Sequence, residues 1–369
     1  MDIGFLIAAE VYASLFALMA VGLTLTYMTT KVPNFAYGSF VTIGLYVNYT
    51  LVQVFHYNPY EGAVLAFPIT GLASAAMYLG VLRPLSRRGS SLVSLMIATF
   101  GVDIGFIGVF GVYTDYLQFR YRLLDAKQFY QLGPDFHVLG LQGIVVVAPL
   151  ILALIAVGLY LLFTRTRFGI AMRASVENPP LARVLGINVE RVYIVSWILA
   201  GGFAGVAGSL YTLWQPGGTS TGSNVIVEIF SSSVLGGLAS IFGAIAGGLV
   251  IGGSEILATI GLAQGFGYLG VGLMVLLLAV GGASLIRRNN RRSKVLGGLL
   301  AALAVYMVVE MLTGYATDIF VQGLVSGFGA NVTPFQKAIP LMIMVLSLLL
   351  LPKGLVSINY RKLLRRGDK

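Results

Sequence analysis

Long apolar stretches separated by short polar loops make up nearly all of this chain. A helix needs roughly 20 apolar residues to cross the ~30 Å hydrocarbon core of a bilayer. Such stretches recur to the end of the chain and predict about ten membrane segments. They are residues 5–28, 38–55, 62–82, 92–113, 142–163, 192–213, 227–258, 268–286, 295–313 and 338–352. The pattern therefore predicts an all-α, polytopic helical membrane protein.

The stretch 227–258 is interrupted by pairs of glycines. Residues 235–248 read Leu-Gly-Gly-Leu-Ala-Ser-Ile-Phe-Gly-Ala-Ile-Ala-Gly-Gly. Paired glycines weaken a helix and allow neighbouring helices to approach closely. We predict a discontinuous helix made of two shorter segments that meet near Ser240. A re-entrant hairpin of this kind has to be buried in protein or line a cavity. The alternative is close packing of ordinary helices through small residues.

A second interruption lies near the start, where residues 32–40 read Val-Pro-Asn-Phe-Ala-Tyr-Gly-Ser-Phe. Pro33 disfavours a helical conformation at Val32, and Asn34 is predicted to cap the next helix. The segment is either a cytoplasmic turn or the counterpart, in the first half of the chain, of the later break. Paired discontinuities mark the transport site in transporters built from repeats.

The basic residues are distributed unevenly over the loops. All but four of the 24 lysines and arginines fall in loops that can share one side of the membrane, the exceptions being Arg120, Arg122, Lys127 and Lys337. The positive-inside rule predicts that residues 165–191, 287–294 and 353–369 are cytoplasmic, including the C-terminus. Residues 114–141 and 214–226 are then external, and the side of the N-terminus stays open. The same rule requires residues 227–258 to leave and return to one side.

Composition agrees with a membrane protein and removes several function classes. The chain is 57% hydrophobic and 10% charged, with a mean hydropathy of +0.88, and one integral membrane domain is expected over residues 1–369. The net charge of +10 is explained by cytoplasmic Lys and Arg facing an anionic leaflet, and no nucleic acid is expected. No cysteine and only two histidines are present, so no metal site and no catalytic residue are predicted. A phosphate-binding Gly-Xaa4-Gly-Lys-Ser/Thr loop is also missing, so neither ATP binding nor another cofactor is expected in this chain.

The loop 164–191 contains a short predicted helix. Asn178 is a good N-cap, Pro179 suits the first helical position and Gly186 suits the end. Helical spacing predicts an apolar stripe of Leu181, Val184 and Leu185. A short amphipathic helix at a membrane face either lies on lipid or enters the groove of a partner.

Acids inside apolar segments are functional candidates, because a carboxylate isolated in lipid is costly. They are Glu10, Asp103, Glu228, Glu255 and Glu310. Each could instead make a helix–helix hydrogen bond, and Asp103 and Glu255 are the two favoured for a cavity or interface. With the residues of the two breaks, the candidates for a translocation path are Asn34, Gly38, Ser39, Asp103, Gly236, Gly237, Ser240, Gly243 and Glu255.

The loop from Gly169 to Asn188 and six other motifs, in the same order along the chain, resemble the permeases of branched-chain amino acid ABC transporters. The six are Val21–Tyr27, Asn34–Gly38, Arg83–Leu85, Ala200–Gly208, Val234–Gly248 and Leu351–Leu355. Two departures stand out. Tyr37 replaces the usual histidine of Asn-Phe-Ala-His-Gly, and residues 287–337 look like an insertion that carries an extra membrane helix.

The resemblance implies a permease subunit of an importer in the cell membrane, with branched-chain amino acids as its favoured substrates. It implies two cytoplasmic ATPases that bind the ATP, a second permease subunit and an external substrate-binding protein. It also implies that the loop 164–191 contacts the ATPase. The coupling residues would be Arg173, Ala174, Leu181, Ala182, Arg183, Val184, Leu185 and Gly186. The alternatives are a urea or short-amide permease, and an ion-driven carrier that uses Asp103 and Glu255.

Overall fold

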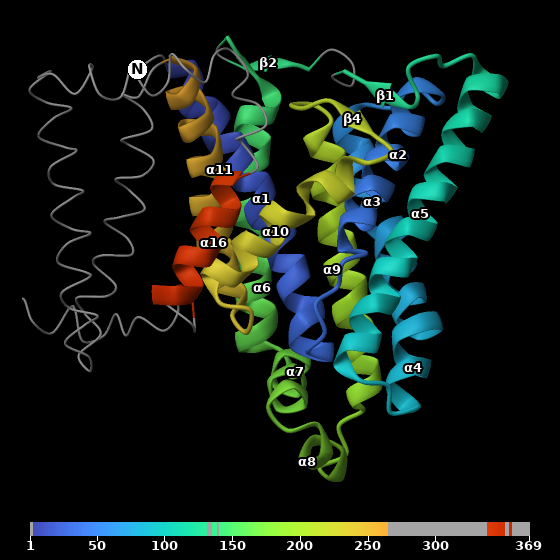
Figure 1. Cartoon of the computed structure of the whole chain (residues 1–369), viewed down its shortest axis with the longest axis vertical. Coiled ribbons are helices and arrows are strands. Elements are labelled where there is room, and N and C mark those ends of the chain that lie inside the picture. The colour runs from blue at the N-terminus through green and yellow to red at the C-terminus, as the bar shows by residue number, and fades with distance from the viewer. Residues whose placement is uncertain (1–2, 131–134, 139, 265–337, 351–353, 356–369) are drawn as a thin grey trace, which may run out of the picture. The chain divides into compact units, whose positions relative to one another are not determined.

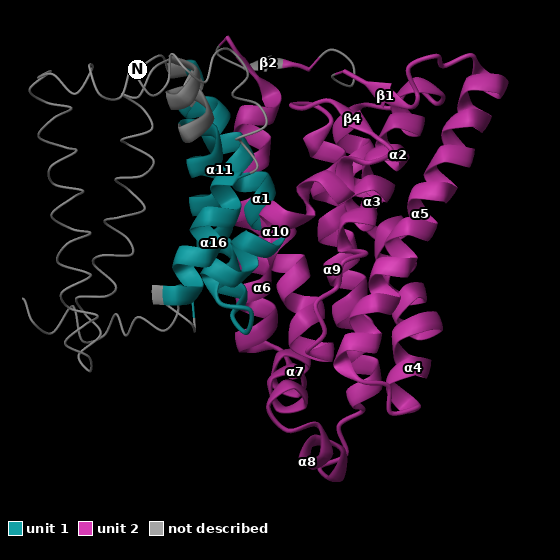
Figure 2. Ribbon diagram, in the orientation of Figure 1, with its two compact units in different colours: residues 1–17, 230–369 teal, residues 18–229 magenta. Residues whose placement is uncertain are grey.

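A computed structural model describes residues 3–130, 135–138, 140–264, 338–350 and 354–355. The predicted segments 268–286 and 295–313, the insertion 287–337 and most of the C-terminal tail lie outside the described residues. The chain divides into two compact units (Figure 2). Unit 1 contains residues 1–17 and 230–369, and unit 2 contains residues 18–229.

The described residues are almost entirely helical (Figure 1). The helices are α1 (Ile3–Thr30), α2 (Tyr37–Gln53), α3 (Pro59–Met77), the π-helical turn η1 (Tyr78–Leu82), α4 (Arg83–Arg87), α5 (Leu92–Tyr121), α6 (Gly143–Arg165), α7 (Arg167–Glu177), α8 (Pro179–Val184), α9 (Val189–Tyr211), α10 (Thr221–Gly236), α11 (Ile241–Gln264) and α16 (Ala338–Leu350). Two antiparallel strand pairs join them, β1 (Gln128–Phe129) with β4 (Gly217–Gly218) and β2 (His137–Val138) with β3 (Leu141–Gln142).

Within the described ranges, five helices are long and apolar enough to cross a membrane. They are Leu6–Thr30, Pro59–Arg87, Leu92–Tyr121, Gly143–Arg165 and Val189–Tyr211. Two shorter apolar helices, Ile241–Leu257 and Ala338–Leu349, add to them. The polytopic helical fold is thus confirmed, while the count of about ten segments stays a prediction.

Two helices are longer than the hydropathy pattern predicted. Asn58 caps α3 by accepting from the Tyr60 amide at 3.0 Å, and the helix continues through η1 into α4, so the basic turn at residue 83 is helical. α5 begins at a similar cap, where Ser91 Oγ accepts from the Ser94 amide at 3.2 Å, and it ends at Arg122 with a left-handed φ of 59°. Polar residues near the end of α5 lowered its hydropathy and hid its last two turns from the sequence pattern.

Small residues form the centre of unit 2, where α2, α3 and α9 pack together. Gly44 of α2 and Gly205 of α9 lie so close that a Cβ on Gly44 would overlap the Gly205 backbone. Ser209 Oγ donates to the Gly44 carbonyl at 2.9 Å, and Asn48 Nδ2 donates to the Ser209 carbonyl at 3.0 Å. Lipid supplies no hydrophobic force between helices, so close packing and hydrogen bonds of this kind hold them together.

α2 runs parallel to α5 and starts partway along it. Ser39 donates to Asp103 at 2.5 Å, and Thr50 pairs with the Tyr113 hydroxyl at 2.6 Å. Residue numbers therefore increase in the same direction along both helices. The Phe35 amide donates to Thr99 Oγ1 at 3.2 Å, which places the link before α2 about 10 Å from the first residue of α5. This depth favours a break within the bundle over a turn at its end.

The prediction that Asn34 caps α2 is wrong. α2 begins at Tyr37, its N-cap is Ala36, and no side chain makes a capping bond there. The Tyr37 amide instead donates to the Asn34 backbone carbonyl at 3.3 Å, so residues 34–37 form a turn before the helix and the Asn34 side chain is left out of it.

In unit 1 the predicted break of residues 227–258 is confirmed. α10 ends at Gly236 and α11 begins at Ile241, with Gly237 in the left-handed region at φ 101°. Ser240 Oγ accepts from the Gly243 amide at 3.1 Å and so caps α11. The core of this unit is formed by Leu235, Ile251, Ile339 and Ile343.

Candidate functional site

α7 and α8 form a module at one end of unit 2 (Figure 1). Asn178 Oδ1 accepts from the Leu181 amide at 3.1 Å and caps α8, and Pro179 is its first residue. Gly186 follows the helix with a φ of 82°, a conformation that glycine adopts without strain. The capped short helix predicted over 178–186 is therefore confirmed.

The apolar stripe of α8 is exposed. Leu181, Val184 and Leu185 are 53%, 82% and 70% exposed, whereas Ala182 is buried and holds the helix to the module. Arg183 is exposed. Large aliphatic side chains on so short a helix gain stability only when a further surface covers them. This part of the molecule is suited to binding a partner or lipid.

The other predicted coupling residues lie in α7. Arg173 donates to the Phe163 carbonyl at the end of α6, and the Ala174 carbonyl accepts from the Asn178 amide at 3.0 Å. These bonds fix α7 to α6 on one side and to the start of α8 on the other. α7 is therefore held between the end of α6 and the start of α8.

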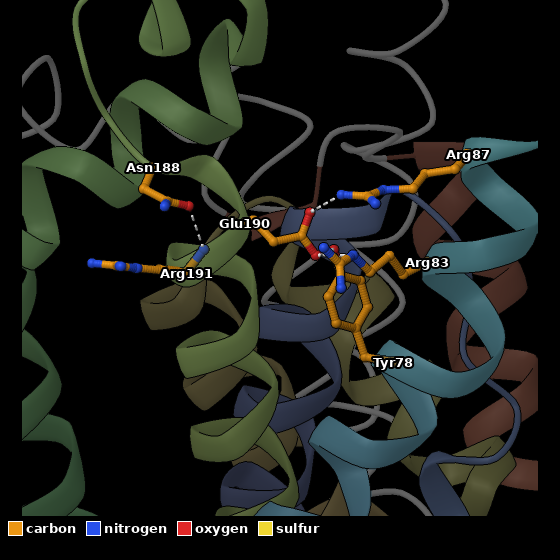
Figure 3. A network of polar contacts seen from close by, with 6 residues as sticks. All are labelled: Tyr78, Arg83, Arg87, Asn188, Glu190 and Arg191. Carbon is orange, nitrogen blue, oxygen red and sulfur yellow. Dashed lines mark hydrogen bonds and ion pairs between the residues drawn. The ribbon is translucent and has the colours of Figure 1, made fainter.

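The sequence did not reveal a polar network that joins this module to the bundle (Figure 3). Glu190, in the first turn of α9, pairs with Arg83 at 2.7 Å and with Arg87 at 3.4 Å. The Tyr78 hydroxyl also donates to Glu190, at 3.5 Å. The available signal was an acid, Glu190, between Arg183 and Arg191 in a loop rich in arginine, but its partners lie more than one hundred positions away in the chain.

The same residues line a cavity of about 980 Å³. Its walls are the end of α1 with Lys31, the η1–α4 segment with Arg83 and Arg87, and the α8–α9 link with Arg183 and Glu190. Four cations and one carboxylate therefore face this space at the end of unit 2 that carries α7 and α8.

Asp103 is the centre of a second polar cluster, within unit 2. Its side chain is 6% exposed and accepts from Ser39 Oγ of α2 and, at 3.1 Å, from Ser223 Oγ of α10. Beside these serines, Gly38 and Gly222 are in backbone contact, and a Cβ on either would overlap the other residue. The structure thus brings the predicted Gly38, Ser39 and Asp103 together and adds the start of α10, which was not among the predicted path residues.

Asn34 and Tyr37 flank the start of α2. Asn34 is 1% exposed, and neither polar atom of its amide has a hydrogen-bond partner among the described residues. The Tyr37 hydroxyl donates to the Ala200 carbonyl at 3.3 Å in the space left by Gly22. The tyrosine that replaces histidine therefore reaches a backbone carbonyl of α9.

The remaining path candidates belong to unit 1. Gly236 and Gly243 are in contact across the break that Gly237 and Ser240 form, and Glu255 is buried farther along α11. Gly354, with a φ of 72°, lies against Gly237. Contact between the C-terminal motif and the break was not predicted, because no local signal links positions so far apart.

The apolar helices and their buried polar clusters define a multi-pass membrane protein. Residues 5–281 match the family described as branched-chain amino acid transport system, permease component. This match covers most of the chain, so the protein belongs to that family of transport permeases. It ends before the predicted insertion 287–337.

Named relatives agree with the family. The chain is 44% identical over 259 residues to a "probable branched-chain amino acid transport permease protein LivH" of Methanocaldococcus jannaschii, covering 70% of this chain and 82% of that protein. The high-affinity permease protein BraD of Pseudomonas aeruginosa is 28% identical, and the match covers 66% of this chain and 81% of that protein. LivH of Escherichia coli K12 is 27% identical, and the match covers 67% of this chain and 82% of that protein. No solved structure was found to match.

Proposed function

We propose that the chain is the transmembrane permease subunit of an ABC importer for branched-chain amino acids in the cell membrane. It works with cytoplasmic ATPase subunits that bind the ATP, a second permease subunit and an external substrate-binding protein. Family membership and the names of the relatives support this role. Residues 165–191 and the C-terminus face the cytoplasm, in keeping with the positive-inside rule.

One observation carries the coupling role. The three large aliphatic residues of α8 are exposed, on a capped helix that projects from the bundle. An apolar helix face of this kind fits a groove on a partner protein. The ATPase groove therefore receives Leu181, Val184 and Leu185.

Motion of α8 then reaches the bundle through the start of α9. Glu190 ties the first turn of α9 to α4, and α9 packs closely on α2 and α3 through glycines. α2 in turn meets the start of α10 beside Asp103. ATP-driven movement at α8 thus changes the packing of the helix starts around Asp103, which alternates access to the path.

The test uses Leu181→Asp combined with Leu185→Asp in the assembled complex. Charges at these exposed positions leave folding intact but oppose burial in an apolar groove. We expect loss of ATPase copurification and of substrate-stimulated ATP hydrolysis. Glu177→Gln, at an exposed position of the same module outside the predicted coupling residues, is the control and should change little, because exposed ion pairs contribute only about 0–1 kcal/mol. Unchanged stimulation and copurification with the double variant would refute the docking role and favour a lipid-surface helix.

A further inference from the structure

Two helices of unit 2 begin with the same arrangement. α2 starts Tyr37-Gly38-Ser39, and α10 starts Thr221-Gly222-Ser223. The second residues, both glycine, are in backbone contact. The third residues, both serine, donate to the two oxygens of Asp103 at 2.5 and 3.1 Å. One carboxylate therefore holds two helix starts against each other.

Asp103 is a buried carboxylate whose observed partners are neutral. No Lys, Arg or His in the described part of the chain forms an ion pair with it. Two hydroxyls fill about half of the roughly four hydrogen bonds that a carboxylate can accept. The positive ends of α2 and α10 reduce the cost of burying the charge, but a cation would reduce it further. The cluster is thus suited to receiving a positively charged group.

Asn34 offers a complementary group in the same segment. The Phe35 amide donates to Thr99, and Ser39 donates to Asp103. Residues 34–39 therefore lie alongside one helical turn of α5, a length of about 6 Å. The Asn34 amide is buried and has no partner among the described residues. An unused buried amide in the segment that leads to Ser39, and a carboxylate without a cation, match the carboxylate and ammonium groups of a zwitterion.

We propose that Asp103 receives the α-ammonium group of the transported amino acid in exchange for the hydrogen bonds of Ser39 and Ser223. The exchange removes the bridge between the two helix starts and lets Gly38 separate from Gly222. The Asn34 amide binds the substrate carboxylate. This proposal rests on the proposed import of amino acids and adds the group that recognises them. A neutral solute such as urea has no ammonium to exchange.

The test measures equilibrium binding of radiolabelled leucine to the assembled permease–ATPase complex in nanodiscs, without the binding protein. Asp103→Asn keeps the shape but removes the charge, and we expect leucine affinity to fall about 10- to 100-fold. The matched control is Asp115→Asn on the same helix, where the exposed carboxylate pairs with Lys127 at 2.8 Å. Its affinity should stay within about twofold, since exposed pairs contribute little.

Two competitors identify the charged group that is recognised. 3-Methylbutylamine keeps the ammonium of leucine without its carboxylate, and 4-methylpentanoate keeps the carboxylate without the ammonium. We expect the amine to displace leucine from the wild-type complex and to lose this ability with Asp103→Asn. Equal competition by the amine in both complexes would overturn the proposal.

A second variant keeps the proposal testable if Asp103→Asn does not fold. Ser39→Ala combined with Ser223→Ala removes the neutral donors that compete with the ammonium, so leucine should bind more tightly than to wild type. A loss of leucine binding there would show that carboxylate and hydroxyls act only as a structural unit. If wild-type complex neither binds nor imports leucine, the proposed function itself fails. If wild type and Asp103→Asn bind leucine equally, only the role of Asp103 fails.

Discussion

Arg83 and Glu190 form an ion pair of 2.7 Å that joins α4 to the first turn of α9. Each side chain is about one-third exposed, and Arg87 adds a second, longer contact to the same carboxylate. Glu190 follows α8 by only a few residues, so this pair is the point where the exposed loop module meets the helix bundle (Figure 3).

Glu190→Gln should uncouple transport from ATP hydrolysis without unfolding the protein. This ion pair is still open to solvent, and solvent-accessible pairs contribute only about 0–1 kcal/mol to stability, so thermal stability should change little. We expect fewer leucine molecules imported per ATP, because α9 can then move without α4. Lys127→Gln, which breaks the Asp115 pair, is the control. An unchanged ratio of transport to hydrolysis would argue against a mechanical link through Glu190.

Bulk at the α10–α11 break should impair transport. Gly236 and Gly243 are in contact, and a Cβ on Gly236 would overlap the Gly243 carbonyl. Gly236→Leu or Gly243→Leu should therefore push the two helices apart and reduce uptake strongly. Gly158→Leu, placed in open space on α6, and Leu249→Ala should have small effects. Normal uptake by both break variants at equal expression would disprove the close-packing role.

Asn34→Leu should stabilise the protein while it slows transport. A buried amide without a partner costs about 1–3 kcal/mol, which an apolar side chain of similar shape avoids. Thermal unfolding and leucine uptake are the two measurements. Asn48→Leu is the matched control and should destabilise, since its amide donates to the Ser209 carbonyl. A less stable Asn34→Leu protein would mean that the amide is satisfied in the native membrane.

Cysteine labelling in intact cells tests the orientation in the membrane. Because the sequence contains no cysteine, only the introduced residue is labelled. Val184→Cys and Ser220→Cys are both at exposed positions, on α8 and before α10. An impermeant reagent should label Ser220→Cys and leave Val184→Cys protected until the cells are opened. The reverse pattern would invert the membrane topology.

Local signals in the sequence predicted much of the fold. Apolar length predicted the membrane helices, and Asn178 with Gly186 predicted α8, because caps and stops depend on neighbouring residues. The glycine pairs predicted the break near Ser240 for the same reason. The capping role of Asn34 was wrong, since the turn over residues 34–37 uses the Asn34 backbone carbonyl and places the start of α2 at Tyr37.

Long-range relationships could not be predicted. The partners of Glu190 and the contact of Gly354 with Gly237 join residues far apart in the chain. Asp103 was a candidate because it is an acid in an apolar helix, yet its two serine donors come from helices whose matching starts are too short to stand out as a motif. The two helix starts can be recognised as one site only because the fold places the Asp103 carboxylate between them.

Import driven by ATP is the central claim, and proteoliposomes test it most directly. The assembled complex is reconstituted with ATP on the ATPase side and binding protein on the other, and uptake of leucine, urea and acetamide is measured. We predict leucine uptake that requires ATP and does not respond to proton or sodium gradients. Leucine uptake by this chain alone, driven by an ion gradient, or preferential uptake of urea or acetamide would contradict the proposed function.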